Sequence, residues 1–153
     1  MSKDDSISKE TAFQNSRTGI DRQEKILIVD DEPDITAIMK KGLEQYGFRV
    51  DVYNDPEIAL KEFKKDRYDL LLLDIKMPKI TGFELYRRLK QLDPRPKVCF
   101  ITAFEIYYDE FRRVFPKIKV SCFVRKPITI AELAKLVWEI LEIKEEVPQR
   151  THR

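Results

Sequence analysis

Histidine and cysteine are scarce in this chain of 153 residues. The one histidine is His152, so a histidine metal site, a histidine general base and a phosphohistidine carrier are excluded as central features. The two cysteines, Cys99 and Cys122, lack the spacing of metal ligands, and both lie in apolar strand patterns. This placement predicts two buried thiols rather than a metal centre.

The chain also lacks a charge excess and a long hydrophobic run. Its 29 basic and 27 acidic residues leave a net charge of +2, which argues against direct nucleic-acid binding, because such binders carry a larger and clustered basic excess. No apolar run reaches the roughly 18 residues of a membrane-spanning helix. The first residues lack the apolar centre of a secretory signal. We therefore expect a cytoplasmic protein without membrane insertion.

The patterning predicts one domain between two tails. Residues 1–24 are polar and without periodicity, which indicates a flexible N-terminal tail. Residues 25–144 alternate strand and helix patterns, and residues 145–153 are expected to form a C-terminal tail. Too few residues follow position 144 for a DNA-binding or enzymatic module. We therefore expect the domain to stand alone and to act through partner proteins.

Apolar strand patterns occur five times, over residues 25–30, 48–53, 68–74, 97–102 and 120–124. Helical patterns lie between and after them, which predicts a parallel sheet covered on both faces. In the first helical pattern, five apolar residues recur at helical spacing: Ile35, Ile38, Met39, Leu43 and Tyr46. The fourth helix is expected over about residues 107–115 and overlaps a segment rich in aromatics (104–111) that suits either packing or partner docking.

Polar side chains stand where four of these strands end. Asp30 and Asp31 follow the first strand, Asp74 closes the third, Thr102 closes the fourth and Lys126 follows the fifth. In open parallel sheets, ligands bind beyond the carboxyl ends of the strands. We therefore expect these five side chains to meet at one rim of the sheet.

Three carboxylates that meet a single lysine leave about two negative charges uncompensated. Two carboxylates ~4 Å apart repel by about 4 kcal/mol at an effective dielectric constant of ~20. A divalent cation would cancel this repulsion, and Mg²⁺ fits best because it prefers oxygen ligands and is commonly held by carboxylates together with a phosphate. A simpler alternative stays open for Asp31 or Asp34, which could serve only as a helix cap.

Four segments give the chain a family resemblance. They are VDDEP (residues 29–33), LLLDIKMPKITGFEL (71–85), ITA (101–103) and FVRKP (123–127). With these motifs in this order, residues 25–144 resemble the receiver domain of two-component response regulators, in the CheY-like superfamily. The resemblance implies a flavodoxin-like α/β fold, with a doubly wound, five-stranded parallel sheet of order 2-1-3-4-5 and five helices.

The resemblance also implies a role for each residue at the rim. Asp74 is expected to be the phosphoacceptor, a nucleophile that takes a phosphoryl group from a phosphohistidine. The expected ligands of Mg²⁺ are Asp30, Asp31, Asp74 and the backbone carbonyl of Lys76. Lys126 is expected to pair with the phosphoryl oxygens, where its charge supports the transfer.

Further roles are implied for the ends of the fourth and fifth strands and for the turns. Thr102 is expected to hydrogen-bond the phosphoryl group, and the small Ala103 to keep the site open to a donor. Phe123 matches the aromatic switch position that turns inward when Thr102 moves, although a plain core role stays open for it. The turns are expected to depend on Pro78, Gly82 and Pro127, the last after a cis peptide bond.

We therefore predict a single-domain response regulator that catalyses only its own phosphorylation and dephosphorylation and is otherwise not an enzyme. The expected partners are a sensor histidine kinase or phosphotransfer protein and a downstream effector protein. Dimerisation through the fourth helix, fifth strand and fifth helix stays open, because residues 113–122 depart from the family pattern. Two alternatives remain: a degenerate receiver that only binds partners, and a haloacid-dehalogenase-type phosphohydrolase. The hydrolase motif has a second Asp two residues after the nucleophile, as its acid/base, and this chain has Lys76 at that position.

Overall fold

The structure is a computed structural model of the whole chain, and it describes residues 23–103, 109, 112–113 and 122–150. The predicted N-terminal tail lies almost wholly outside the described residues. The aromatic segment 104–111 and the predicted fourth helix lie outside them apart from residues 109 and 112–113, which are helical.

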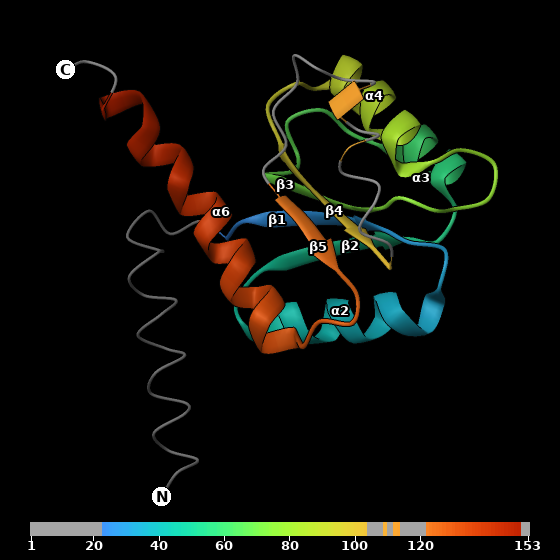
Figure 1. Cartoon of the computed structure of the whole chain (residues 1–153), viewed down its shortest axis with the longest axis horizontal. Coiled ribbons are helices and arrows are strands. Elements are labelled where there is room, and N and C mark those ends of the chain that lie inside the picture. Colours follow the sequence, from blue (N-terminus) through green and yellow to red (C-terminus); the bar gives the residue numbers. More distant parts are fainter. Residues whose placement is uncertain (1–22, 104–108, 110–111, 114–121, 151–153) are drawn as a thin grey trace, which may run out of the picture.

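Five parallel strands form one sheet in the order β2-β1-β3-β4-β5 (Figure 1). The strands are β1 (Lys25–Val29), β2 (Arg49–Tyr53), β3 (Leu70–Asp74), β4 (Lys97–Thr102) and β5 (Cys122–Arg125). The central strand β3 is buried along its whole length, as expected for a strand covered on both faces. The predicted sheet order is confirmed.

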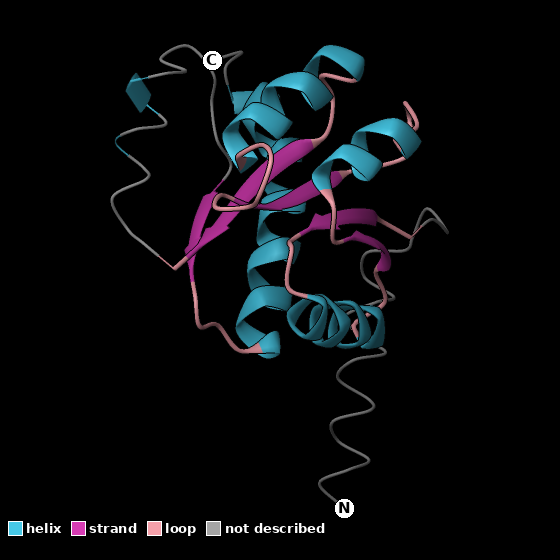
Figure 2. Ribbon diagram, turned by 90° about the vertical axis from the view of Figure 1, so that its right-hand side faces the viewer, coloured by secondary structure: helices cyan, strands magenta, loops and turns pink. Residues whose placement is uncertain are grey.

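Within the described residues, four helices cover the two faces of the sheet (Figures 1 and 2). Helices α2 (Pro33–Gln45) and α6 (Ile130–Arg150) share one apolar core with the sheet, and α3 (Pro56–Glu62) and α4 (Gly82–Leu92) share the other. None of these helices is long and apolar enough to cross a membrane. The alternation of strands and helices thus positions every strand end at a loop, where polar side chains can gather.

Local side-chain caps explain where two of the helices begin. The carboxylate of Asp55 accepts the backbone N–H of Glu57 at 2.8 Å at the start of α3. Thr129 and Glu132 form a reciprocal capping box before α6, with both hydrogen bonds at 3.1 Å. Helix α6 continues to Arg150, so residues 145–150 are helical. The run of Glu, Lys and Ile before position 147 favours this extension, since these residues form helices readily or tolerate them.

Two of the five apolar residues at helical spacing along α2 do not face the core. Met39 and Leu43 are buried, but Ile35 is at the surface and the side chain of Ile38 is 59% exposed. Successive helical residues are turned by about 100°, so a stripe centred on Met39 and Leu43 leaves Ile38 outside. The packing of α6 against Gly42 sets this centre, because a Cβ at Gly42 would lie 2.4 Å from the side chain of Ile130.

The prediction of two buried thiols is also wrong for Cys99. Cys99 is fully buried in β4 and is disulfide-bonded. It lies directly opposite Cys122, the other cysteine of the chain, in the register of β4 and β5. Neighbouring strands are about 4.8 Å apart, which lies within the Cα separation of disulfides. The register therefore accounts for the departure from free thiols.

Candidate functional site

The ends of four strands bring acidic, hydroxyl and basic side chains to one rim of the sheet. Asp74 is the last residue of β3 and Thr102 the last of β4. The backbone N–H of Lys126, just beyond β5, donates to the carbonyl of Thr102 at 2.8 Å. The backbone N–H of Asp30, just beyond β1, donates to the carbonyl of Tyr53 at 3.2 Å. The parallel register thus holds these positions side by side.

The carboxylates of Asp30, Asp31 and Asp74 form a compact acidic group. One oxygen from each lies within 4.8 Å of the others. Asp30 and Asp74 are buried and Asp31 is half-buried. Burial and then the charge of Asp30 raise the pKa of Asp74 to about 7, against the opposing effect of Lys126. The site therefore holds more negative charge than its surroundings stabilise.

Lys126 is the basic side chain at this rim. Its Nζ lies 2.9 Å from Oδ2 of Asp30, 3.4 Å from Oε1 of Glu32 and 3.9 Å from Oδ2 of Asp74. Burial works to lower the pKa of Lys126, but the hydrogen bond to Asp30 and the charges of Asp74 and Asp30 outweigh it and raise the pKa. One cation thus faces several carboxylates and cannot neutralise them all.

This donor set fits Mg²⁺. Three carboxylates supply oxygen ligands of the kind that this ion prefers, and a shared divalent cation would remove the repulsion that raises the pKa of Asp74. The backbone N–H of Lys76 hydrogen-bonds to Asp74, which keeps the loop after β3 close to the acidic group. The residues that could hold the ion are therefore Asp30, Asp31, Asp74 and, through its carbonyl, Lys76.

The loop after β3 passes so close to Asp74 that only glycine fits at position 82. A Cβ at Gly82 would lie 2.2 Å from the carbonyl oxygen of Asp74. The backbone N–H of Gly82 donates to the carbonyl of Ile75 at 2.8 Å, and that of Ile80 donates to the carbonyl of Pro78 at 2.9 Å. This compact turn fixes the backbone from which the Asp74 side chain extends.

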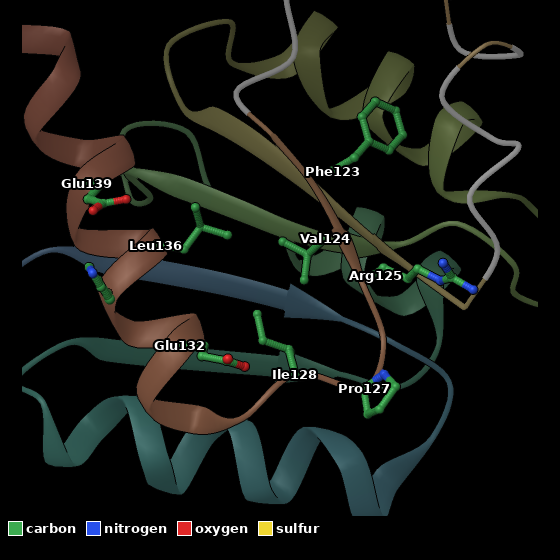
Figure 3. A pocket seen from close by; sticks show the side chains of 9 residues that line it. Phe123, Val124, Arg125, Pro127, Ile128, Glu132, Leu136 and Glu139 are labelled. Atoms are coloured by element: carbon green, nitrogen blue, oxygen red, sulfur yellow. The ribbon is translucent and has the colours of Figure 1, made fainter.

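The predicted switch residues lie at the ends of β4 and β5. Thr102 is buried, Ala103 is exposed and Phe123 is half-buried. The ring of Phe123 packs on Phe100, with centroids 5.4 Å apart, on the face of the sheet that α4 covers. Val124 points to the opposite face, where a pocket lies between β5 and α6 (Figure 3).

The pocket beside β5 combines apolar and charged residues. Phe123, Val124, Arg125, Pro127, Ile128, Glu132, Lys135, Leu136 and Glu139 line it. The Lys126–Pro127 peptide bond, which is cis, leads from the acidic rim into this surface. Lys126, which is predicted to bind a phosphoryl group, is therefore adjacent in the chain to this pocket.

Two residues at the rim were missed in the sequence. Asn54 donates its side-chain N–H to the carbonyl of Asp30 at 2.8 Å and to Oγ1 of Thr36 at 3.0 Å. The backbone N–H of Glu32 donates to Oδ1 of Asp30 at 3.0 Å. Asn54 directly follows the second strand, so the strand-end rule that selected Asp30 could have found it. Both residues support the backbone and carboxylate of Asp30.

Comparison with known proteins gives the family. Residues 26–138 match the model of the response regulator receiver domain. The transcriptional regulatory protein TrcR of Mycobacterium tuberculosis is 32% identical over 109 residues, which make up 71% of this chain and 42% of the relative. The response regulator receiver protein CpdR of Brucella abortus is 36% identical over 80 residues, 52% of this chain and 67% of the relative. The chain spans about half the length of the transcriptional regulators it matches.

Solved structures share the fold. The response regulator protein TrrA of Thermotoga maritima, in complex with Mg(2+)-BeF, has a TM-score of 0.64 and 30% identity over 77% of this chain and 99% of that chain. TrrA in complex with the histidine kinase ThkA has a TM-score of 0.65 and 32% identity over 78% of this chain and 99% of that chain. The matched motif positions, the sheet order and the family model agree: the chain belongs to the response regulator receiver domains of two-component signalling.

Proposed function

We propose that this domain takes a phosphoryl group onto the carboxylate of Asp74 from a histidine kinase or phosphotransfer protein. The reaction depends on Mg²⁺ and changes the surface of the domain for contact with an effector protein. The observation that carries the proposal is the convergence of Asp30, Asp31 and Asp74 within 4.8 Å, with Lys126 beside them. The kinase complex and the Mg(2+)-BeF complex of the relative TrrA support it.

The chemical step is a displacement at phosphorus. One carboxylate oxygen of Asp74 forms a bond to phosphorus while the bond from phosphorus to the donor's imidazole nitrogen breaks, and the electron pair stays on that nitrogen. Mg²⁺ held by Asp30, Asp31, Asp74 and the carbonyl of Lys76 would supply charge compensation for the transfer. Lys126 adds its own positive charge to the phosphoryl oxygens, and such groups contribute mainly by positioning and electrostatics.

The raised pKa of Asp74 explains why the proposed reaction needs a cation. With a pKa of about 7, a large share of the metal-free carboxyl groups is protonated at neutral pH, and a protonated oxygen is a poor nucleophile. A bound cation favours the ionised form and so makes the nucleophile available. Without a metal ion, Lys126 and the backbone N–H of Lys76 oppose the effects of burial and of Asp30, and the pKa of Asp74 is still raised.

The proposed switch begins with the new charge on Asp74. An acyl phosphate carries more negative charge and more acceptor oxygens than the carboxylate, so it offers Thr102 and Lys126 a new partner. Thr102 lies at the end of β4, and Phe123 of β5 packs on Phe100 of the same strand. A shift of Thr102 would therefore change the position of Phe123 and the shape of the pocket between β5 and α6. An effector protein, or a second copy of the chain, docks on this surface in our proposal.

The donor protein must dock beside the acidic rim. Helix α2 begins at Pro33, directly after the acidic pair, and presents Ile35 and Ile38 to solvent. Apolar side chains exposed together on one helix suit a protein interface. We propose that the histidine kinase or phosphotransfer protein packs on this part of α2. The cytoplasmic location and the domain boundaries expected from the sequence stay predictions.

The proposal is tested by incubating the protein with Mg²⁺ and acetyl phosphate. One acid-stable, base-labile phosphate per chain is expected, Asp74→Asn should abolish it, and Asp30→Asn should weaken its dependence on Mg²⁺. Asp34→Asn is the matched control, because Asp34 is an exposed carboxylate in the first turn of α2. Labelling that persists in Asp74→Asn would show the proposal to be wrong. A protein that binds partners but takes no label would be a degenerate receiver, and turnover of an unrelated phosphomonoester would favour a hydrolase.

A further inference from the structure

We propose that Glu32 is a positioning residue that competes with the phosphoryl group on Asp74 for the ammonium group of Lys126. The inference rests on the proposed function and adds a residue outside the acidic group to it. Glu32 would act only through Lys126, and not by contact with the phosphoryl group or with a metal ion.

The position of Lys126 shows the competition. Its Nζ is closer to the carboxylates of the loop after β1, at 2.9 Å from Asp30 and 3.4 Å from Glu32, than to Asp74 at 3.9 Å. Before transfer, the ammonium group of Lys126 is therefore held near Asp30 and Glu32 and away from Asp74, where the phosphoryl group would be. To reach a phosphoryl group on Asp74, it must leave one or both of these partners.

Glu32 is the competitor that persists when the site fills. Asp30 belongs to the acidic group that fits Mg²⁺. Its ion pair with Lys126 would therefore weaken if its carboxylate oxygens bound that ion. Glu32 does not belong to that group, and its side chain is 60% exposed. The backbone N–H of Glu32 donates to Oδ1 of Asp30, which keeps Glu32 beside the site. Its carboxylate thus remains available to Lys126 during phosphoryl transfer.

The effect is expected to be modest. Exposed ion pairs contribute little, so releasing Lys126 from Glu32 should change rates by no more than about five-fold. Glu32→Gln removes the charge and keeps the shape. Glu32→Asp keeps the charge near the site but shortens the side chain by one methylene group, so the contact with Lys126 is lost. Both variants should therefore release Lys126. An effect that comes only from removing a negative charge near the site, and not from the contact, would appear in Glu32→Gln alone.

The first readout needs no phosphorylation. The metal-free protein is treated with an amine-acetylating reagent, and the labelling rate of each lysine is measured by peptide mass spectrometry. Lys126 should label faster in both Glu32 variants than in the wild type. An unchanged rate for Lys126, or a faster rate in Glu32→Gln only, would overturn the proposal.

The chain contains a matched control for this measurement. Like Lys126, Lys79 contacts two carboxylates that are two residues apart in the sequence. Its Nζ lies 2.9 Å from Asp55 and 3.5 Å from Glu57. Glu57→Gln should speed the labelling of Lys79 and leave that of Lys126 unchanged. The Glu32 variants should do the reverse, and an equal response of both lysines to either variant would contradict a local contact.

The second readout is the rate of Asp74 phosphorylation by acetyl phosphate at saturating Mg²⁺. Both Glu32 variants should raise the limiting rate at high donor concentration, because Lys126 is free to meet the phosphoryl charge. A change in the donor concentration needed for half-maximal rate, seen in Glu32→Gln alone, would indicate repulsion of the anionic donor and overturn the proposal. A wild-type protein that takes no phosphoryl group contradicts the proposed function, and the labelling rates then still decide whether Glu32 holds Lys126.

Discussion

Replacing Asp74 with asparagine is expected to stabilise the metal-free protein at pH 8, although it removes the proposed phosphoacceptor. Asp74 closes a fully buried strand and is itself only 6% exposed. The carboxylates of Asp30 and Asp31 lie beside it. A carboxylate in such a place loses hydration and is repelled by its neighbours. Asparagine keeps the shape of the side chain without the charge.

The size of the effect follows from the pKa of Asp74, which burial and then Asp30 raise from 3.8 to about 7. The folded protein therefore binds this proton more tightly than the unfolded chain does. The stability linked to it is fully present below pH 3.8 and is lost as the pH rises to about 7. An interval of roughly 3 pH units at about 1.4 kcal/mol per unit gives an upper bound of ~4 kcal/mol. Relaxation of the protein around the charge and screening by solvent reduce this bound. We therefore expect Asp74→Asn to raise the free energy of unfolding at pH 8 by about 2 kcal/mol.

The assay is urea denaturation of wild type and Asp74→Asn in a chelating buffer at pH 5 and pH 8, with Asp34→Asn as the control for loss of an exposed charge. The free energy of unfolding of Asp74→Asn should exceed that of the wild type, and by more at pH 8 than at pH 5. Added Mg²⁺ should reduce the difference, because it binds the ionised wild-type site. An advantage of equal size at both pH values, or a less stable variant at pH 8, would refute the reasoning.

Two further substitutions probe the surroundings of the site. Gly82→Ala should lower the free energy of unfolding by about 1–3 kcal/mol and slow phosphorylation, because the added Cβ would clash with the carbonyl oxygen of Asp74. Unchanged stability and an unchanged rate would contradict this. Asp93→Asn should cost about 1–3 kcal/mol at pH 7 and leave phosphorylation unchanged, because the buried carboxylate accepts backbone N–H groups of Asp66 and Arg95. Burial raises the pKa of Asp93, but these hydrogen bonds lower it overall. The wild-type advantage should therefore be fully present above pH 3.8 and shrink as the pH falls below that value. Urea denaturation at pH 7 and at about pH 3 checks both points, and an advantage of equal size at both pH values would contradict them.

The strands and the rim were predictable because they depend on local patterns, whereas the sheet order was predicted from the family resemblance. Apolar runs mark the strands, and the residue type that closes each run is visible in the sequence. Asp74 at the end of four leucines is the clearest case, since a carboxylate that follows such a run must lie at the edge of a buried strand.

The remaining features depend on how distant segments pack. Ile38 is exposed because α6 packs near Gly42, and no pattern within α2 contains that information. The bonding state of Cys99 depends on the register of β4 with β5. The contact of Glu32 with Lys126 joins residues 94 positions apart, and a glutamate before a helix is indistinguishable in sequence from a cap.

The most direct test of the proposed function is to identify the residue that carries the phosphoryl group. After treatment with Mg²⁺ and acetyl phosphate, peptide mass spectrometry should find one modified side chain, that of Asp74, and none when a chelator replaces Mg²⁺. A phosphoryl group on another residue, an unmodified chain, or full labelling in the presence of the chelator would contradict the role assigned to the acidic group.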